Sequence, residues 1–313
     1  MDATDVRIFC EMADRQGGYN ILLERKPSTG AVARQLRLDE KTVRTRVRRM
    51  EKEGFIQFYQ ADPHLGLLGI DTVATYRFET VNLTTKRNLV AAVERSPMIL
   101  EAHEFIGPYL SARIGGSDEN PPVKTARDLA RQFELATVPL GSVGIDAPPM
   151  TLDRLDWRLV QALRFDARRG TREVARDLGI TERMAEYRLA KLMNSGALRV
   201  RAVLDSQHQQ GLVFYELEVA LEESHRQATL DRMRERFGPH FWSIHRPTEG
   251  VLIANLFGFT LAAPESAALD VQQYPGVHRC GVFIQKTAIE SPTPGWIDAR
   301  IASALEGAAR PPR

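Results

Sequence analysis

The sequence predicts an α+β fold in which one structural unit occurs twice. The chain has 313 residues, enough for about two average domains or about four small ones. A shift of 142 residues aligns residues 31–56 with 173–198 and residues 103–116 with 245–258. Self-similarity that keeps one register over such a distance indicates that the two halves of the chain share a fold.

Each half begins with a pattern of three helices and a strand. Apolar residues at helical spacing predict the first helix, and a short helix, a tight turn and a further helix follow. A stretch rich in aromatic and β-branched residues then predicts a strand. These parts occupy 5–13, 29–36, 39–54 and 55–61 in the first half, and 156–165, 171–178, 181–196 and 198–204 in the second. This order is the layout of a winged helix-turn-helix.

The remainder of each half alternates strands and helices in the order βαββαβ, which is the ferredoxin-like plan. The sequence therefore predicts two winged helix-turn-helix domains and two ferredoxin-like βαββαβ domains in tandem, with a proline-containing linker at 146–151. The expected boundaries are 1–66 and 152–206 for the winged helix-turn-helix domains, 67–147 and 207–290 for the ferredoxin-like domains, and 291–313 for a C-terminal tail. The starts of the halves align at a shift of 151, so the first half carries about nine extra residues, expected within 15–28.

Composition excludes several classes of protein. Net charge is +2 and the sequence pI is 8.6, values that by themselves indicate no partner. Two cysteines, Cys10 and Cys280, are too few for a disulfide framework or a metal cluster and fit a reducing compartment. The first residues lack the apolar core of a signal peptide, and the longest apolar run, 65–70, is too short to span a membrane. We therefore expect a cytoplasmic protein without a membrane partner.

The helix expected within 39–54 concentrates positive charge on one side. Val43, Val47 and Met50 share the side that faces the neighbouring helices, while Asp39 is placed to cap the start and Gly54 to end the helix. Most charged helix faces are only solvated, and they usually mix signs to form i,i+4 pairs. Because this helix keeps like charges adjacent, we interpret it as the recognition helix of a DNA-binding domain.

Specific side chains are expected to contact double-stranded DNA. Residues in the first turns would reach base edges and the arginines would contact phosphates, which supply most of the affinity. The first group is Lys41, Thr42 and Thr45, and the second is Arg44, Arg46, Arg48 and Arg49. The equivalent helix in the second half offers Arg183, Tyr187, Arg188 and Lys191, but there Glu182 and Glu186 would oppose phosphate. We expect its contribution to be smaller.

These motifs resemble the Lrp/AsnC (leucine-responsive/asparagine-synthetase regulator) family of prokaryotic transcription factors. The resemblance rests on 2–9 and 152–163 for the opening helix, 32–59 for the helix-turn-helix and 100–116 for the small-molecule-binding half. It implies DNA binding and a RAM-like effector module that pairs with another, with amino acids or similar metabolites between the paired modules. Members are usually about half this length, so we expect the two modules to pair within one chain and the protein to form a homodimer or higher homo-oligomer. Recognition helices would then lie about 34 Å apart on DNA.

Ligand-binding residues are less clearly marked. The resemblance points to Gly107 and Tyr109 in the turn of the effector module and to His103 and His245 at equivalent strand positions. The family's glycine-plus-acid turn reads GPYLS at 107–111, without an aspartate. No phosphate loop, nucleophile elbow or metal-binding spacing occurs, so we expect neither a cofactor nor a metal.

Three functions are compatible with these features of the sequence. The first is a sequence-specific transcriptional regulator that is nucleoid-associated and modulated by a metabolite. The second is a chromatin-like architectural DNA-binding protein. The third is an enzyme, because siroheme decarboxylases resemble this architecture and use histidine and arginine around a tetrapyrrole, as His103, His245, Arg113 and Arg246 would. Such an enzyme does not need a cationic recognition helix, so the sequence-based expectation is a regulator and not an enzyme.

Overall fold

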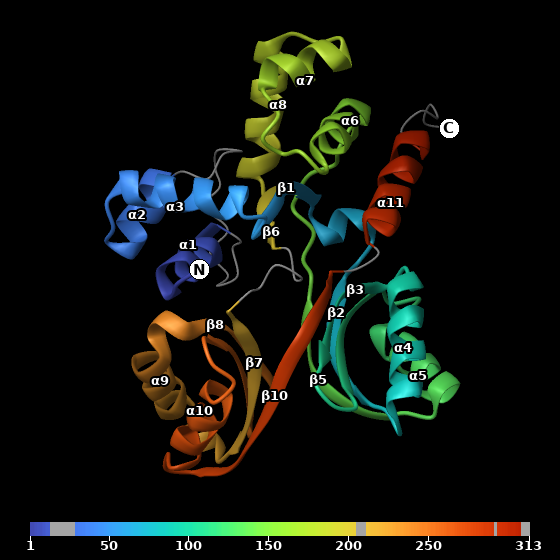
Figure 1. Cartoon of the computed structure of the whole chain (residues 1–313). Coiled ribbons are helices and arrows are strands. Elements are labelled where there is room, and N and C mark those ends of the chain that lie inside the picture. Colours follow the sequence, from blue (N-terminus) through green and yellow to red (C-terminus); the bar gives the residue numbers. More distant parts are fainter. Residues whose placement is uncertain (13–28, 205–210, 291–292, 308–313) are drawn as a thin grey trace.

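The computed structural model describes residues 1–12, 29–204, 211–290 and 293–307. The extra segment expected within 15–28 lies outside the described residues. The fold is α+β, as predicted. The elements of the two halves form an upper group, which is mostly helical, and a lower group of strands and helices (Figure 1).

The upper group contains two three-helix segments and two strands. In the first half these are α1 (Ala3–Met12), α2 (Thr29–Leu36), α3 (Glu40–Lys52) and β1 (Ile56–Pro63). In the second half they are α6 (Arg154–Leu163), α7 (Thr171–Leu178), α8 (Glu182–Asn194) and β6 (Leu198–Leu204).

The sequence correctly predicted the ends and the buried face of α3. The Asp39 side chain accepts hydrogen bonds from the backbone N–H groups of Lys41 and Thr42, and Gly54 follows the helix with φ of 76°. Val43, Val47 and Met50 are buried, as predicted. The equivalent residues of α8, namely Ala185, Leu189 and Leu192, are buried as well.

Strands β1 and β6 pair antiparallel and join the two three-helix segments. Asp62 of β1 binds Arg201 of β6 at 2.7 Å and also the buried guanidinium of Arg164 at the end of α6. A single apolar core runs through both segments, and the last helix, α11 (Thr293–Gly307), adds Trp296 and Ile301 to it. The two segments therefore form one packed body.

The lower group is built on an eight-stranded sheet in the order β5-β2-β4-β3-β10-β7-β9-β8. From the first half come β2 (Thr72–Glu79), α4 (Leu83–Arg95), β3 (Ile99–Phe105), β4 (Tyr109–Gly116), α5 (Pro122–Phe133) and β5 (Ala136–Gly144), after the short 3-10 helix η1 (Leu65–Leu68). From the second half come β7 (Val213–Leu221), η2 (Glu223–His225), α9 (Arg226–Phe237), η3 (Gly238–His240), β8 (Phe241–Thr248), β9 (Val251–Gly258), α10 (Ala263–Gln272) and β10 (Val277–Glu290).

Strand β10 links the two half-sheets. Its first part pairs with β7 and its last part, from Gln285 onward, pairs with β3 of the other half. Helices α4 and α5 cover one half-sheet and α9 and α10 cover the other, so that helices lie outside and the strands lie between them (Figure 1). Strands β5 and β8, at the two ends of the order, also approach each other. The uncovered faces of the half-sheets are thereby turned towards one another.

Among the described helices, none combines the length and the apolar character needed to cross a bilayer.

Candidate functional site

The inner face of the first half-sheet carries polar and charged side chains. Alternate residues of a strand point to the same face, so the cross-strand register decides which side chains meet. Two rows are aligned in this way: Arg77, Ser111 and His103 in one, and Thr75, Arg113 and Glu101 in the other. The intervening residues, such as Phe78, Ala102 and Ala112, pack under α4 and α5.

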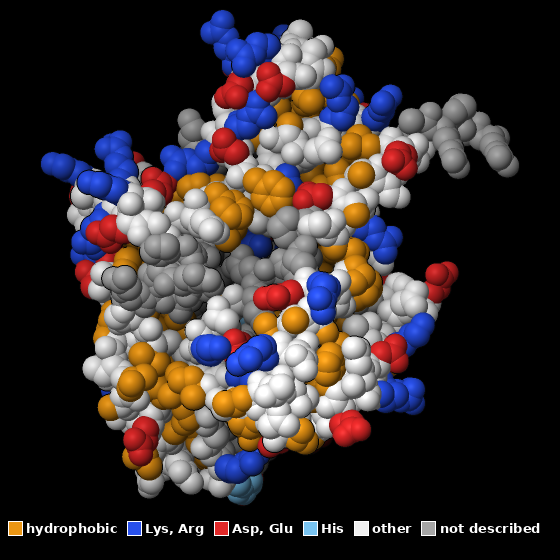
Figure 2. All heavy atoms as spheres, turned by 45° about the vertical axis from the view of Figure 1, so that its right-hand side comes forward, with side chains coloured by type: hydrophobic (Ala, Val, Ile, Leu, Met, Phe, Trp, Pro, Cys, Tyr) orange, Lys and Arg blue, Asp and Glu red, His pale blue; other side chains and the backbone are white. Residues whose placement is uncertain are grey.

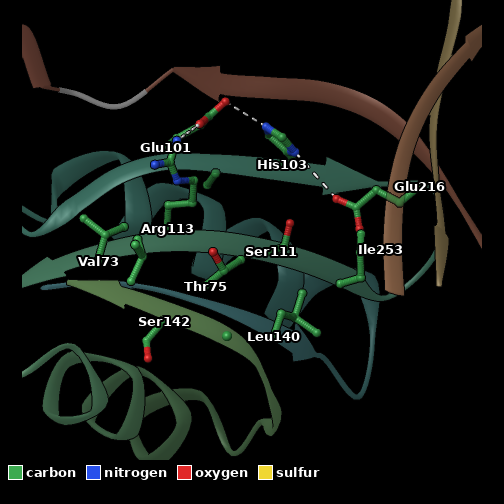
Figure 3. A pocket seen from close by; sticks show the side chains of 13 residues that line it. Val73, Thr75, Glu101, His103, Ser111, Arg113, Leu140, Ser142, Glu216 and Ile253 are labelled. Atoms are coloured by element: carbon green, nitrogen blue, oxygen red, sulfur yellow. Dashed lines mark hydrogen bonds and ion pairs between the residues drawn. The ribbon is translucent and has the colours of Figure 1, made fainter. Parts of the chain in front are cut away.

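A cavity of about 420 Å³ lies between the two half-sheets. Its walls come from β2, β3, β4 and β5 of the first half and from β7 and β9 of the second, which contribute Glu216 and Ile253 (Figure 3). Small-molecule pockets usually measure about 300–1,000 Å³. The Ser111 hydroxyl lines this cavity although the residue is only 4% exposed. Polar and apolar side chains line the cavity together, as they do in small-molecule sites.

His103 lies between two carboxylates that belong to different halves (Figure 3). Its Nε2 is 3.0 Å from Glu101 Oε1, and its Nδ1 is 3.8 Å from Glu216 Oε1. Burial alone lowers the pKa of this histidine, but the interactions with Glu101 and Glu216 outweigh burial and raise the pKa to about 9. His103 is therefore an imidazolium at neutral pH.

Two arginines complete the charge pattern. Arg113 lines the cavity and lies 3.0 Å from Glu101 Oε2, the carboxylate oxygen other than the one that His103 contacts. Arg77 of β2 is 4% exposed, lies 2.9 Å from Glu216 and also binds Glu218, so it connects the first half-sheet to β7. Its guanidinium stacks 3.7 Å from the centre of the Phe283 ring. The contact between the halves at this point is ionic and buried.

The raised pKa of His103 predicts a pH-dependent stability. Since the folded pKa of about 9 exceeds the unfolded value of about 6.5, the ion pairs stabilise the fold fully below pH ~6.5 and are lost as pH rises through 9. Between pH ~6.5 and ~10 the free energy of unfolding should fall by up to about 3 kcal/mol more in the wild type than in His103→Asn. Urea titrations at each pH measure this difference. His278→Asn, at an exposed histidine of β10, is the matched control and should follow the wild type; equal slopes for the wild type and His103→Asn would contradict the assignment.

The structure separates the ligand residues that the sequence grouped. His103 lines the cavity, whereas the described cavity lining does not include Gly107 or Tyr109, which lie in the turn between β3 and β4 and at the start of β4. The Tyr109 ring packs 5.1 Å from that of Phe283 instead. His245 is on β8, where its backbone pairs with Ile253, a lining residue, but its side chain lies outside the described part of the chain.

Sequence reasoning missed Glu101, Glu216 and Arg77. A signal was present: polar residues at alternate positions, Glu101 and His103 in 99–105 and Glu216 and Glu218 in 213–221, interrupt otherwise largely apolar strands. Such a pattern indicates a strand with one polar face. It did not indicate that the two polar faces would oppose each other.

A second candidate surface is the exposed side of α3 and α8, the two helices that the sequence predicts to contact DNA. Lys41, Arg44 and Arg48 are exposed on α3, with Arg44 bound to Glu40 at 2.8 Å, one helical turn away. Thr42, Thr45 and Arg49 are exposed too, as are Arg183, Tyr187 and Lys191 on α8. Figure 2 shows Lys and Arg side chains projecting from the upper part of the molecule, where Figure 1 places these helices.

Arg46 and Arg188 differ from the other predicted DNA contacts because each is held by two aspartates of its own half. Arg46 lies 2.7 Å from Asp2 and 2.8 Å from Asp5 at the start of α1. Arg188 binds Asp153 and Asp156 at the start of α6. Asp5 and Asp156 are buried, so these guanidinium groups neutralise buried carboxylates. Both guanidinium groups are thus already engaged by carboxylates of their own half. Arg49 also binds Asp5 but keeps 44% of its side chain exposed.

Comparison with protein-family models finds an AsnC-type helix-turn-helix domain at residues 152–193. The match covers α6, α7 and nearly all of α8. The chain therefore carries an AsnC-type helix-turn-helix in its second half. Comparison with curated proteins gives no match.

Among solved structures, the fold is similar to that of the siroheme decarboxylase NirDL. One NirDL structure aligns with a TM-score of 0.59 and 16% identity, covering 96% of this chain and 99% of that chain. A second, in complex with an iron-uroporphyrin III analogue, aligns with a TM-score of 0.58, 15% identity and the same coverage. E. coli AsnC aligns over 43% of this chain and 92% of its own, with a TM-score of 0.37 and 15% identity.

The expectation that this chain is not an enzyme is contradicted by the NirDL structures. An enzyme shares its fold over nearly the whole of both chains. At this level of identity the similarity shows the fold alone.

Proposed function

We propose that this protein is a sequence-specific DNA-binding transcriptional regulator of Lrp/AsnC type. The observation that carries the proposal is the exposed cationic side of α3, with Lys41, Arg44 and Arg48, in a chain whose second half carries an AsnC-type helix-turn-helix. Exposed like charges on one helix suit a polyanion such as DNA. The cytoplasmic, nucleoid-associated location and a homodimer or higher homo-oligomer are parts of this proposal.

The chain would be a tandem duplication of a winged helix-turn-helix and a RAM-like effector module. Supporting this, the order of helices and strands repeats, with the 3-10 turns differing. The arginine that binds an aspartate pair also recurs, as Arg46 in one half and Arg188 in the other. The two modules then pair within the chain through β3 and β10, as two subunits do in a dimer.

The proposed DNA contacts are the exposed residues alone. Lys41, Thr42, Thr45 and Tyr187 would reach base edges, and Arg44, Arg48, Arg49, Arg183 and Lys191 would contact phosphates. Because the two helices present different side chains, the preferred site is an imperfect palindrome.

The cavity between the half-sheets is the proposed effector site. Arg113 and the Ser111 hydroxyl offer donors to a carboxylate, and Glu216 offers an acceptor to an ammonium group. An amino-acid-like zwitterion matches this pairing. In this proposal Ser111, Arg113 and Glu216 take the place that the sequence gave to Gly107 and Tyr109.

Selection of duplexes from a random pool tests the proposed function. A sequence-specific regulator should enrich one site, and each single base-pair change in that site should weaken binding by about 1–3 kcal/mol. An architectural protein would bind every duplex with nearly the same affinity. Lack of binding even in dilute buffer would exclude both.

The fold shared with NirDL supports a second candidate, a decarboxylase acting on a carboxylate-bearing tetrapyrrole such as siroheme. His103 and Arg113 line the cavity and would face such a substrate. These two cations, however, already pair with Glu101 and Glu216, which weakens their attraction for its carboxylates. Release of CO2 from siroheme by the purified protein, lost in His103→Ala, would establish this activity over the regulator.

A further inference from the structure

Helix α8 exposes two large apolar side chains away from its core, Tyr187 on the opposite side and Met184 on one flank. Met184 is 44% exposed and Tyr187 is 70% exposed, in the first two turns after the N-cap Thr181. Single exposed apolar residues are common, whereas neighbouring ones form a patch that can bind another molecule. Met184 and Tyr187 are such neighbours, because they lie one helical turn apart. In a helix-turn-helix, these turns of the second helix are the part that reaches base edges.

The placement of the two side chains on α8 is defined by its buried residues. At about 100° per residue, Tyr187 points almost directly away from the side formed by Ala185, Leu189 and Leu192, and Met184 lies about 60° to one side of Tyr187. Arg183 and Lys191 lie within about 40° of Tyr187. The apolar pair is thus bordered by cations on the face that would meet DNA.

The nearby acidic residues do not obstruct this face. Glu186 lies about 100° from Tyr187 and Glu182 lies farther round the helix. Glu186 would therefore lie at the flank of the groove, where it opposes phosphate and weakens non-specific binding. When attraction to the DNA backbone is weaker, the side chains that contact bases contribute a larger share of the affinity and so of the discrimination between DNA sequences.

The equivalent positions of α3 are Thr42 and Thr45, which are also exposed. The two recognition helices thus share one geometry and differ in chemistry at these two positions. Threonine hydroxyls exchange hydrogen bonds with base edges, whereas methionine and tyrosine offer mainly apolar surface. In the major groove the apolar group of a base is the C5-methyl of thymine.

We propose that Met184 and Tyr187 recognise thymine methyl groups in the half-site bound by α8. This inference rests on the proposed function, because it requires α8 to lie in the major groove. It assigns thymine-rich sequence to one half of the operator and identifies the pair as specificity-determining residues. Arg183 and Lys191 hold the helix to the backbone on either side of the pair.

Replacing single thymines by uracil tests the proposal, because uracil lacks only the methyl group. Starting from a selected duplex, each thymine is substituted in turn and the affinity is measured by fluorescence anisotropy. At one or more positions the wild type should lose about fourfold in affinity, the value for one buried methyl group. In Met184→Ser/Tyr187→Ser these positions should show no loss, while thymines near α3 should respond as in the wild type.

Leu261→Ser/Leu269→Ser is the matched control, since both leucines are exposed far along the chain from α8, at 71% and 58%. This variant should retain every uracil effect. If the wild type binds a selected site but no uracil effect depends on Met184 and Tyr187, the methyl-reading role is wrong while DNA binding stands. If the serine variant changes only the oligomeric mass, the pair is a protein contact and the proposal is overturned. Absence of any DNA binding removes the proposed function itself.

Discussion

Replacing Lys41, Arg44 and Arg48 together by alanine is expected to flatten the salt dependence of DNA binding by about two units of slope, one for each of the proposed phosphate contacts of Arg44 and Arg48. Each contact with a phosphate releases a counterion and contributes about 0.9 to the slope of log K against log salt concentration. These three side chains are exposed on one side of α3. Affinity measured at four or more salt concentrations gives the slope, and the loss should be greatest at low salt.

A matched control removes the same charge elsewhere. Lys124, Arg127 and Arg131 are exposed on α5, which covers the outer face of the first half-sheet. Their replacement by alanine changes net charge equally and should leave the slope within about half a unit of the wild type. An unchanged slope in the α3 variant, or equal changes in both variants, would show that the cationic side of α3 is only solvated surface.

Replacing Arg77 by methionine is expected to destabilise the fold by about 3–5 kcal/mol at neutral pH. The change removes the buried cation that bridges Glu216 and Glu218, which leaves only His103 beside Glu216 and the exposed Arg279 beside Glu218. Removing one partner of a buried ion pair is costly. Urea unfolding measures the loss. Arg77→Met combined with Glu216→Gln and Glu218→Gln should recover most of it, because no buried charge is then left alone.

Arg113→Met is the comparison for Arg77→Met. Its side chain is 44% exposed and it pairs with the half-buried Glu101, so the loss should be about 1 kcal/mol or less. Equal losses at Arg77 and Arg113 would show that the buried ionic contact between the halves stabilises the fold no more than the exposed ion pair does.

Local features were predictable from the sequence. The cap at Asp39, the end of α3 at Gly54 and the buried face through Val43 and Met50 depend on residues a few positions apart, and all are present. The recurrence of the same pattern in the second half made the α+β fold predictable as well. Interactions within a helix follow from spacing alone.

Contacts between distant residues were not predictable in the same way. Arg46 was assigned to phosphate because it lies on a basic helix, yet it neutralises Asp2 and Asp5, more than 40 positions away. The cavity depends on β10 crossing from β7 to β3, which brings Glu216 to His103. No periodicity within one strand indicates which strand of the other half will lie opposite.

The pairing of β1 with β6 has a consequence for how occupancy depends on protein concentration. Helices α3 and α8 are held by one polypeptide, so in the proposed regulator the second helix would engage the duplex without a further collision between molecules. Occupancy of a two-part site should then rise with the first power of protein concentration, where a regulator assembled from separate subunits at low concentration would show the second power. A cell would obtain a graded response from very few copies.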